Sequence, residues 1–369
     1  MREGWEYKKL GDSCVIEYGT RVVQKKDGGT IYPVYGGGGE TFRMDKYNRE
    51  NCLVVARFAM SRTCVRYVKG KFFLNDSGLS INAGKELLQS YLNHHILHLN
   101  DDIYNLGKGA AQRNLDVNSF RNLIIAIPPL STQLSIVSEL DKINELIRLK
   151  KEQLKDYENL AQSIFYEMFG DPVVNEKGWE ERTMQDLCVN IVDCPHSTPK
   201  KVDYITDYPC IRTSELRGGS ISWATMQYLD EDEYNIRIAR LKPEAGDIVF
   251  GREGTIGDAV ILPLGYNFSL GQRTMLLRAD TSIVSNIFLH RIILSDWIKH
   301  QIEYVNVSST VAHVNIKDFK KFTVPLPPLP LQQLFAQRIK LIEKQKAEVQ
   351  RTIADLETLL ASRMQYWFD

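Results

Sequence analysis

Two loops of this 369-residue chain gather side chains that can hydrogen-bond an anion or a flat polar edge. The first is GKGAAQRNLDVNSF, residues 107–120, and the second is VNVSSTVAHVNIKDF, residues 305–319. Each combines small residues with amide, hydroxyl, imidazole or guanidinium groups just before a strand-like run. Such groups bind phosphates and base edges, as arginine does with guanine and asparagine or glutamine with adenine. A turn that only caps a helix would have a similar composition, so both interpretations stay open.

A run of four glycines, Gly36–Gly39, allows the backbone to approach a ligand closely. No Gly-Lys-Ser/Thr sequence follows, so the run is not a nucleotide phosphate loop. It is either a flexible surface turn or a loop that enters a DNA groove, with Arg43 and Lys46 behind it. The glycines of GREGTIGDAV, residues 251–260, lack the spacing of a dinucleotide-binding fingerprint and predict a tight turn between strands.

The sequence contains no complete catalytic or metal-binding constellation. His94 and His98 lie one helical turn apart, but two histidines without a third ligand are more typical of surface or core positions than of a metal site. Asn-Pro-Pro-Tyr/Phe, the motif of enzymes that methylate exocyclic amines, is missing, and so is the Pro-Asp dipeptide of a common nuclease motif. Walker A, H-E-x-x-H and G-x-S-x-G are missing too. We therefore expect no catalysis, cofactor or metal in this chain.

Two long helical patterns must position the loops, and they nearly repeat each other. They lie in residues 127–170 and 326–369, and they align without a gap at an offset of 199 residues. Ser131 or Thr132 could cap the first helix, and Gly170 is a suitable stop. An apolar seam with 4-3-4-3 spacing follows both patterns for more than four heptads, which is typical of coiled coils and predicts that the two helices pair. The seam residues expected to pair or to bind a partner are Ile136, Leu140, Ile143, Ile147, Leu154, Phe335, Ile339, Ile342, Ile353 and Leu356.

The repeat extends into the globular parts of the chain. GWEYKKLGDSC, which starts at Gly4, matches GWEERTMQDLC, which starts at Gly178, at an offset of 174 residues. CLVVAR, residues 52–57, lies over DIVFGR, residues 247–252, at an offset of 195. The offset then reaches 199, so the second copy carries about 25 more residues in its loops (199 − 174). A kept frame with diverged loops is expected where one scaffold recognises different targets.

Short apolar runs bounded by Gly, Asn or Pro predict strands in both copies, and helical patterns cover roughly residues 85–99 and 287–304. The expected fold is α+β, with two tandem mixed α/β domains that are each followed by a long helix. The predicted boundaries are 1–127 and 171–326 for the domains, and 128–170 and 327–369 for the helices.

Arg57 and Arg252 occupy matching places in the repeat, which favours both as phosphate contacts, although plain surface arginines remain an even alternative. The candidate DNA-binding residues are Gly37, Gly38, Arg43, Lys46, Arg57, Lys108, Gln112, Arg113, Asn114, Arg212, Arg217, Arg252, Gln272, Arg273, Thr310, His313 and Asn315.

Composition is ordinary for a soluble globular protein, with 43% hydrophobic and 25% charged residues. No apolar run reaches the length of a membrane span, no signal peptide opens the chain, and six scattered cysteines fit the reducing cytoplasm. Net charge is zero, but residues 1–128 hold 18 Lys+Arg against 13 Asp+Glu, whereas residues 172–328 hold 17 against 20. The first region has the electrostatic bias of a DNA-binding domain, and the second does not.

The tandem plan resembles the specificity subunits of type I restriction–modification systems over essentially the whole chain. The resemblance rests on Ile127-Pro128-Pro129-Leu130 with Gln133, on the second copy Leu326-Pro327-Pro328-Leu329 with Gln332, and on the two Gly-Trp-Glu openings. In this family, Glu commonly precedes that glutamine, whereas Thr132 and Leu331 stand there in this sequence.

The resemblance implies two target-recognition domains, each reading one half of a split, asymmetric sequence of double-stranded DNA. The two helices would pack antiparallel as a spacer and bind two methyltransferase subunits, to which restriction subunits attach. S-adenosylmethionine, ATP and Mg would then belong to those partners. A coiled-coil adaptor that does not recognise DNA is the alternative, followed by a stand-alone nuclease or methyltransferase. The sequence does not reveal the bases that are recognised.

Overall fold

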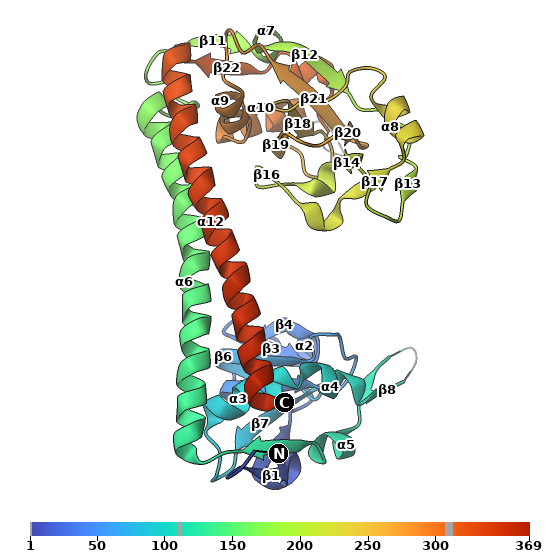
Figure 1. Ribbon diagram of the computed structural model, residues 1–369, viewed down its shortest axis with the longest axis vertical. Coiled ribbons are helices and arrows are strands. Elements are labelled where there is room, and N and C mark those ends of the chain that lie inside the picture. Colours follow the sequence, from blue (N-terminus) through green and yellow to red (C-terminus); the bar gives the residue numbers. More distant parts are fainter. Residues whose placement is uncertain (1, 110–111, 307–312) are drawn as a thin grey trace. The chain divides into compact units, whose positions relative to one another are not determined.

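The computed structural model describes residues 2–109, 112–306 and 313–369 (Figure 1). The chain divides into two compact units: unit 1 comprises Met1–Gln153 with Val349–Asp369, and unit 2 comprises Leu154–Glu348. Each unit therefore contains one globular domain and about half of each long helix. The predicted boundaries divide the chain differently, because they separate each domain from the helix that follows it. These boundaries stay a prediction.

Unit 1 is built on a six-stranded mixed sheet with the strand order β2-β7-β5-β6-β3-β4. Neighbouring strands are antiparallel, except that β3 and β6 run parallel. The strands of this sheet are β2 (Cys14–Tyr18), β3 (Tyr32–Gly36), β4 (Gly39–Met44), β5 (Arg49–Ala56), β6 (Val65–Leu74) and β7 (Gly78–Ala83). Two small antiparallel pairs complete the unit, β1 (Glu6–Lys9) with β10 (Ile124–Ile127) and β8 (Gly107–Lys108) with β9 (Asn114–Leu115).

Four helices of unit 1 contribute to the core on one face of this sheet: α1 (Leu10–Ser13), α3 (Gln89–His98), α4 (Asn100–Asn105) and α5 (Val117–Arg121). A fifth helix, α2 (Gln24–Asp27), buries no residue. Leu53 and Val55 of β5 join the core under the helices, whereas Cys52 and Val54 join a second core on the other face. Burial on both faces explains why this strand is a continuous apolar run in the sequence.

Unit 2 splits the corresponding sheet into two sheets of four strands. The first has the order β12 (Cys188–Asp193), β21 (Thr274–Ala279), β18 (Ile248–Gly251) and β19 (Ala259–Ile261), and it is antiparallel throughout. The second has the order β13 (Lys201–Val202), β17 (Gln227–Leu229), β14 (Pro209–Ile211) and β20 (Ser269–Leu270), in which β14 and β20 run parallel. Two antiparallel pairs accompany them, β11 (Glu180–Thr183) with β22 (Thr323–Leu326) and β15 (Leu216–Arg217) with β16 (Ser220–Ile221).

The helices of unit 2 are α7 (Met184–Leu187), α8 (Glu231–Arg237), α9 (Asn286–Ile293), α10 (Asp296–Asn306) and α11 (Ile316–Phe319), with 3-10 turns at Thr213–Glu215 and Trp223–Thr225. They follow the same order as those of unit 1, except that α8 lies between β17 and β18, whereas α2 lies between β2 and β3. The single helix predicted over 287–304 is wrong, because the chain breaks between α9 and α10. Ser295 lies in this break, and the carbonyl of Ile292 accepts from both its hydroxyl, at 2.6 Å, and its N–H, at 3.1 Å.

Equivalent backbone hydrogen bonds show that the two globular domains share one frame. The N–H of Leu10 donates to the carbonyl of Leu123, and that of Met184 donates to Phe322. The parallel strand pair repeats as well: Val34 of β3 pairs with Phe73 of β6, and Cys210 of β14 pairs with Ser269 of β20. Four further N–H to carbonyl hydrogen bonds match between the copies. Those of the first copy, donor first, are Gly84 to Ser13, Asn75 to Tyr35, Arg57 to Ser77 and Leu115 to Arg57. Their counterparts in the second copy, in the same order, are Asp280 to Leu187, Gly271 to Ile211, Arg252 to Arg273 and Val314 to Arg252.

The two long helices are α6 (Leu130–Phe169) and α12 (Leu329–Phe368), each of 40 residues. All the seam residues predicted to pair are buried or half-buried. The prediction that Ser131 or Thr132 caps α6 is wrong, because both lie inside its first turn. Gly170 ends α6 as expected, with a φ of 77° that favours glycine.

Within each unit, the halves of α6 and α12 lie side by side and antiparallel (Figure 1). In unit 1, Glu139 pairs with Arg363, and Lys151 pairs with Glu357 at 2.8 Å. In unit 2, Glu158 pairs with Lys346 at 3.1 Å, and Phe165 packs against Phe335 with ring centroids 5.7 Å apart. The residue numbers rise on α6 while they fall on α12 in both units. A continuous coiled coil along both helices stays a prediction.

A buried glutamine holds the start of each long helix to its own domain. The amide oxygen of Gln133 accepts from the N–H of Leu88 at 2.8 Å, and its nitrogen donates to the carbonyls of Glu86 and Pro128. Gln332 repeats this arrangement with Ser285, Ile283 and Pro327. Both side chains have zero solvent exposure. This role explains why the glutamine accompanies the Pro-Pro pair in both copies.

Candidate nucleic-acid interface

The polar loops of unit 1 meet at one edge of its sheet, which we call loop edge 1. It comprises residues 36–39, 57–63, 75–77, 107–109 and 112–115, together with Arg66 of β6 and Tyr104 of α4. Three hydrogen bonds hold the β5–β6 loop there: Arg57 N–H to the carbonyl of Ser77 at 2.8 Å, Ala59 N–H to Oδ1 of Asn114 at 3.3 Å, and Met60 N–H to the carbonyl of Arg113 at 2.9 Å. The structure therefore brings together the predicted residues Arg57, Arg113 and Asn114.

The β5–β6 loop contains a backbone conformation that favours glycine. Ala59 has a φ of 48°, and Gly254, at the same offset of 195 in unit 2, has a φ of 76°. A non-glycine residue in this region costs of order 1 kcal/mol and persists only where surrounding contacts fix it. The loop shape is thus part of the shared frame.

The glycine run forms the tight turn between β3 and β4. A side chain at Gly37 would meet the carbonyl of Phe58 at 2.6 Å, whereas Gly38 is exposed with open space around it. Gly37 thus belongs to loop edge 1. Arg43 and Lys46 are exposed, and Arg43 pairs with Pro33 at the far end of the hairpin. That the two stand behind the glycines stays a prediction.

Four arginines of unit 1 cluster at loop edge 1 without a counter-ion. They are Arg57, Arg62, Arg66 and Arg113, and no carboxylate of the described residues forms an ion pair with any of them. The guanidinium of Arg57 lies over the rings of Tyr18 and Phe58 and donates to the carbonyl of Asp76. Arg66 donates to the carbonyls of Gly37 and Thr63. These four charges give the edge a positive field that favours phosphate.

Two further predicted residues of this edge are exposed. Lys108 forms an ion pair with Asp116 at 2.5 Å, and this hydrogen bond with those from Ser119 lowers the pKa of Asp116 to about 2. Gln112 is exposed, and no hydrogen bond of its side chain is present among the described residues.

Unit 2 presents an equivalent edge, loop edge 2, which comprises residues 193–196, 252–258, 271–273 and 313–315. Its arginines are neutralised. Arg252 is buried, and its guanidinium pairs with Asp193 and donates to the carbonyl of Val314. Arg273 is exposed and pairs with Glu253 at 3.2 Å, and Gln272 donates to the carbonyl of His196. The prediction of a phosphate contact therefore suits Arg57 but not its counterpart Arg252, whose donors are used inside the domain.

The remaining predicted residues of unit 2 divide between structural and exposed positions. Arg212 pairs with the buried carboxylate of Glu215 at 2.7 Å. Arg217 is exposed on the β15–β16 hairpin, and His313 is exposed at loop edge 2. Asn315 caps α11, as Asp116 caps α5, so the capping interpretation holds at these two places. Thr310 lies outside the described residues.

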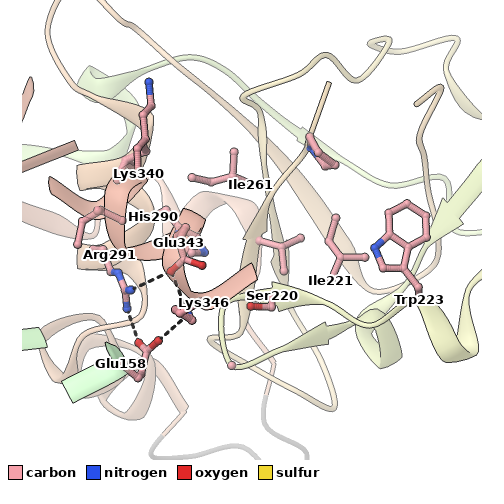
Figure 2. Close-up of a pocket in the computed structure, with 16 residues that line it drawn as sticks. Glu158, Ser220, Ile221, Trp223, Ile261, His290, Arg291, Lys340, Glu343 and Lys346 are labelled. Atoms are coloured by element: carbon pink, nitrogen blue, oxygen red, sulfur yellow. Dashed lines mark hydrogen bonds and ion pairs between the residues drawn. The ribbon is translucent and has the colours of Figure 1, made fainter. Parts of the chain in front are cut away.

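Unit 2 also contains a pocket of about 430 Å³ between the β15–β16 hairpin, β19, α9 and α12. Figure 2 shows Glu158 facing Arg291 and Lys346 in this pocket. The ion pairs measure 2.6 Å and 3.1 Å, and Glu343 pairs with the same two cations at 3.8 Å and 2.9 Å. Two carboxylates thus balance two cations beside walls formed by Ile221, Ile261 and neighbouring apolar residues. Buried His290 forms a hydrogen bond with the carbonyl of Ala259, and burial lowers its pKa to about 4. These contacts anchor α9 and α12 to each other through α6.

Three residues of loop edge 1 could not be predicted from the sequence. Arg62 and Arg66 lie just beyond the repeated CLVVAR segment, where the two copies diverge, so the repeat gave no signal for them. Tyr104 was missed because its role depends on packing: both the Arg62 and Arg113 guanidinium groups lie over its ring. Within residues 2–109, 112–306 and 313–369, no helix is both long and apolar enough to cross a membrane.

Comparison with known proteins identifies the family. The family model of the type I restriction modification DNA specificity domain matches residues 2–158 and again residues 176–358. This chain belongs to that family. The two matches correspond to the two repeats, and the resemblance stated from the sequence is confirmed.

Curated relatives agree with this assignment. The specificity subunit of the type I restriction enzyme MjaVIII of Methanocaldococcus jannaschii is 21% identical over 275 residues, which are 69% of this chain and 64% of that protein. A putative MjaX specificity subunit of the same organism is 21% identical over 73% of this chain and 66% of its own length. This chain thus spans just under two thirds of the length of these two relatives. A putative type I specificity subunit of Haemophilus influenzae is 21% identical over 89% of this chain and 84% of its own length.

Solved structures share the fold of this chain. The S subunit of a type I restriction–modification system from M. genitalium superposes with a TM-score of 0.60 at 14% identity, covering 99% of this chain and 96% of that one. A chain from a structure that describes complex assembly and conformational transition of the type I R-M system gives a TM-score of 0.52 at 18% identity, covering 99% and 97%. The expected fold class, two mixed α/β domains with long helices, is confirmed.

Proposed function

We propose that this chain is the DNA sequence-specificity subunit of a type I restriction–modification complex. One observation carries the proposal: a single hydrogen-bonded frame occurs twice, and its two loop edges differ in charge and side chains. A frame that is kept while its edges diverge supports recognition of two different half-sites in one asymmetric target. Family membership and the uncompensated arginines of loop edge 1 support DNA as the ligand.

The long helices have two roles in this proposal. They set the spacing between the half-sites, and they bind two methyltransferase subunits, to which restriction subunits attach. Both helices expose leucines that could bury apolar surface against a partner. These are Leu130, Leu134, Leu146, Leu149 and Leu160 of α6 and Leu334, Leu341 and Leu359 of α12. The chain itself would not catalyse, and S-adenosylmethionine, ATP and Mg would bind to the partner subunits in the cytoplasm.

Mapping of methylated adenines across the genome tests the proposal. Cells that carry this chain with its methyltransferase are compared with cells that lack only this chain. We expect a split motif, two short specified halves around unspecified bases, in the first cells alone. Identical methylation in both, with an active methyltransferase, would contradict the proposal and favour an adaptor that does not recognise DNA.

A further inference from the structure

Two arginines of loop edge 1 share one aromatic ring. The Cζ atom of Arg113 lies 4.6 Å from the ring centroid of Tyr104, on α4, and that of Arg62 lies 5.0 Å from it. A guanidinium over an aromatic face is attracted to it and loses freedom, while its N–H groups at the rim stay available for hydrogen bonds. The ring therefore orients both cations before any ligand binds.

The backbone on both sides of the ring is fixed as well. Nε of Arg113 donates to the carbonyl of Gly107 at 3.0 Å, and the carbonyl of Arg113 accepts from Met60. The carbonyl of Arg62 accepts from Nδ2 of Asn100 at 2.8 Å. Asn100 also accepts from the N–H groups of Cys64 and Val65. The loop that carries Arg62 is thus attached directly to the helix that carries Tyr104.

The hydrogen-bond donors that remain are unused. Among the described residues, the two Nη groups of Arg113 and the whole guanidinium of Arg62 have no hydrogen-bond acceptor and no ion-pair partner. Asp101 of α4 accepts from Nδ2 of Asn100 at 3.0 Å. Arg57 and Arg66 differ, because each donates an Nη group to backbone carbonyls of the loop edge. A pair of open, oriented Nη groups is what a bidentate contact needs.

We propose that Arg113 and Arg62, stacked on Tyr104, bind guanine in the half-site that unit 1 recognises. Guanine presents two acceptors, O6 and N7, on its major-groove edge, and two parallel N–H groups of one arginine match them. A phosphate would accept either arginine or lysine, whereas the two-point contact with guanine requires the planar guanidinium. This inference rests on the proposed function, and it adds the class of base and the residues that select it.

Conservative variants of the full chain, assembled with its methyltransferase, provide the first test. Arg113→Lys and Arg62→Lys keep the charge but lose the two-point contact, and Arg182→Lys, an exposed arginine of β11, is the matched control. Methylated sites are mapped for each variant. We expect relaxed preference at a guanine position of one half-site only, by about 5- to 150-fold per contact, with the other half-site and the spacing unchanged. The control keeps the wild-type motif.

Binding to modified DNA provides the second test and does not depend on activity. In the mapped half-site, each guanine is replaced in turn by 7-deazaguanine, which lacks the N7 acceptor. The wild-type complex should lose affinity at the contacted guanine, and the corresponding lysine variant should lose nothing further there.

Three outcomes overturn the inference in different ways. If both lysine variants methylate the wild-type motif, neither arginine makes the proposed contact with guanine. If Arg113→Ala and Arg62→Ala lose methylation equally at all sites, and the lysine variants restore it at every site, the two arginines contact phosphates instead. If the wild-type chain directs no methylation at all, the proposed function fails and the inference falls with it.

Discussion

Arg57 and Arg252 stand at the same place in the shared frame, and their surroundings are opposite. Arg57 stacks on two aromatic rings without a carboxylate partner, whereas Arg252 is buried against Asp193. The same contrast holds across the two edges, with four uncompensated arginines in unit 1 and paired ones at loop edge 2. The frame therefore fixes where an arginine stands, and the neighbouring residues decide whether its charge is available. The excess of Lys and Arg in residues 1–128 reflects this difference.

This contrast predicts that the two units contribute differently to binding. Loop edge 1 would supply much of the sequence-independent attraction to phosphate, which depends on salt. Loop edge 2 would depend more on hydrogen bonds and shape, and on the phosphate contacts of partner subunits.

The largest expected effect comes from shortening both helices without altering either edge. Deleting seven residues from each, 151–157 of α6 and 347–353 of α12, keeps the heptad phase and removes about 10 Å. We expect methylation to disappear at all original sites and to reappear at sites whose halves are about three base pairs closer, at ~3.4 Å per pair along a strand.

The control for this deletion replaces two exposed residues of the deleted α6 segment, Lys155 and Asp156, by alanine without changing length. It should keep the original spacing. If the deletion variant keeps that spacing but changes its base preference, the helices are not the spacer.

The equivalence of the two units can be tested by the same substitution at the buried glutamine of each. Gln133→Leu and Gln332→Leu each remove three hydrogen bonds and leave buried backbone groups unpaired. We expect each to lower the free energy of unfolding by about 3 kcal/mol, measured by urea denaturation. Gln333→Leu, at the exposed neighbouring position, should change it little. A large effect in one unit only would contradict the equivalence of the two glutamines.

The difference between the edges can be measured at the two matching arginines. Arg57→Gln should reduce the slope of log K against log salt by about 0.9, because one phosphate contact is lost. Arg252→Gln should leave the slope unchanged but lower the free energy of unfolding by about 2 kcal/mol, since Asp193 and the carbonyl of Val314 lose a donor. Equal slopes of log K against log salt for wild type and Arg57→Gln would show that Arg57 makes no phosphate contact.

Most of the frame could be predicted from the sequence, because it depends on patterns that occur twice. The seam residues, the strand-like runs and the stop at Gly170 all follow from periodicity and local backbone preference. The break at Ser295 and the failed cap at Ser131 could not be predicted, since a helical pattern does not show which hydroxyl takes a backbone partner. The edges were predictable only as loops. Whether Arg252 is available depends on Asp193, 59 residues away in the chain, and no local signal reveals that contact.

The smallest expected effect tests whether the loop conformation itself belongs to the frame. Ala59 and Gly254 occupy the same left-handed position, and no atom within 4 Å except Oγ1 of Thr213, at 4.0 Å, would meet a side chain at Gly254. Ala59→Gly should therefore relieve strain and raise the free energy of unfolding by up to about 1 kcal/mol, and Gly254→Ala should lower it by a similar amount. Thermal denaturation of both variants measures this. Opposite signs of similar size would mean that the frame imposes the conformation and that unit 1 tolerates its cost. If Ala59→Gly instead destabilises the protein, the alanine methyl contributes packing or limits the unfolded chain by more than the strain costs.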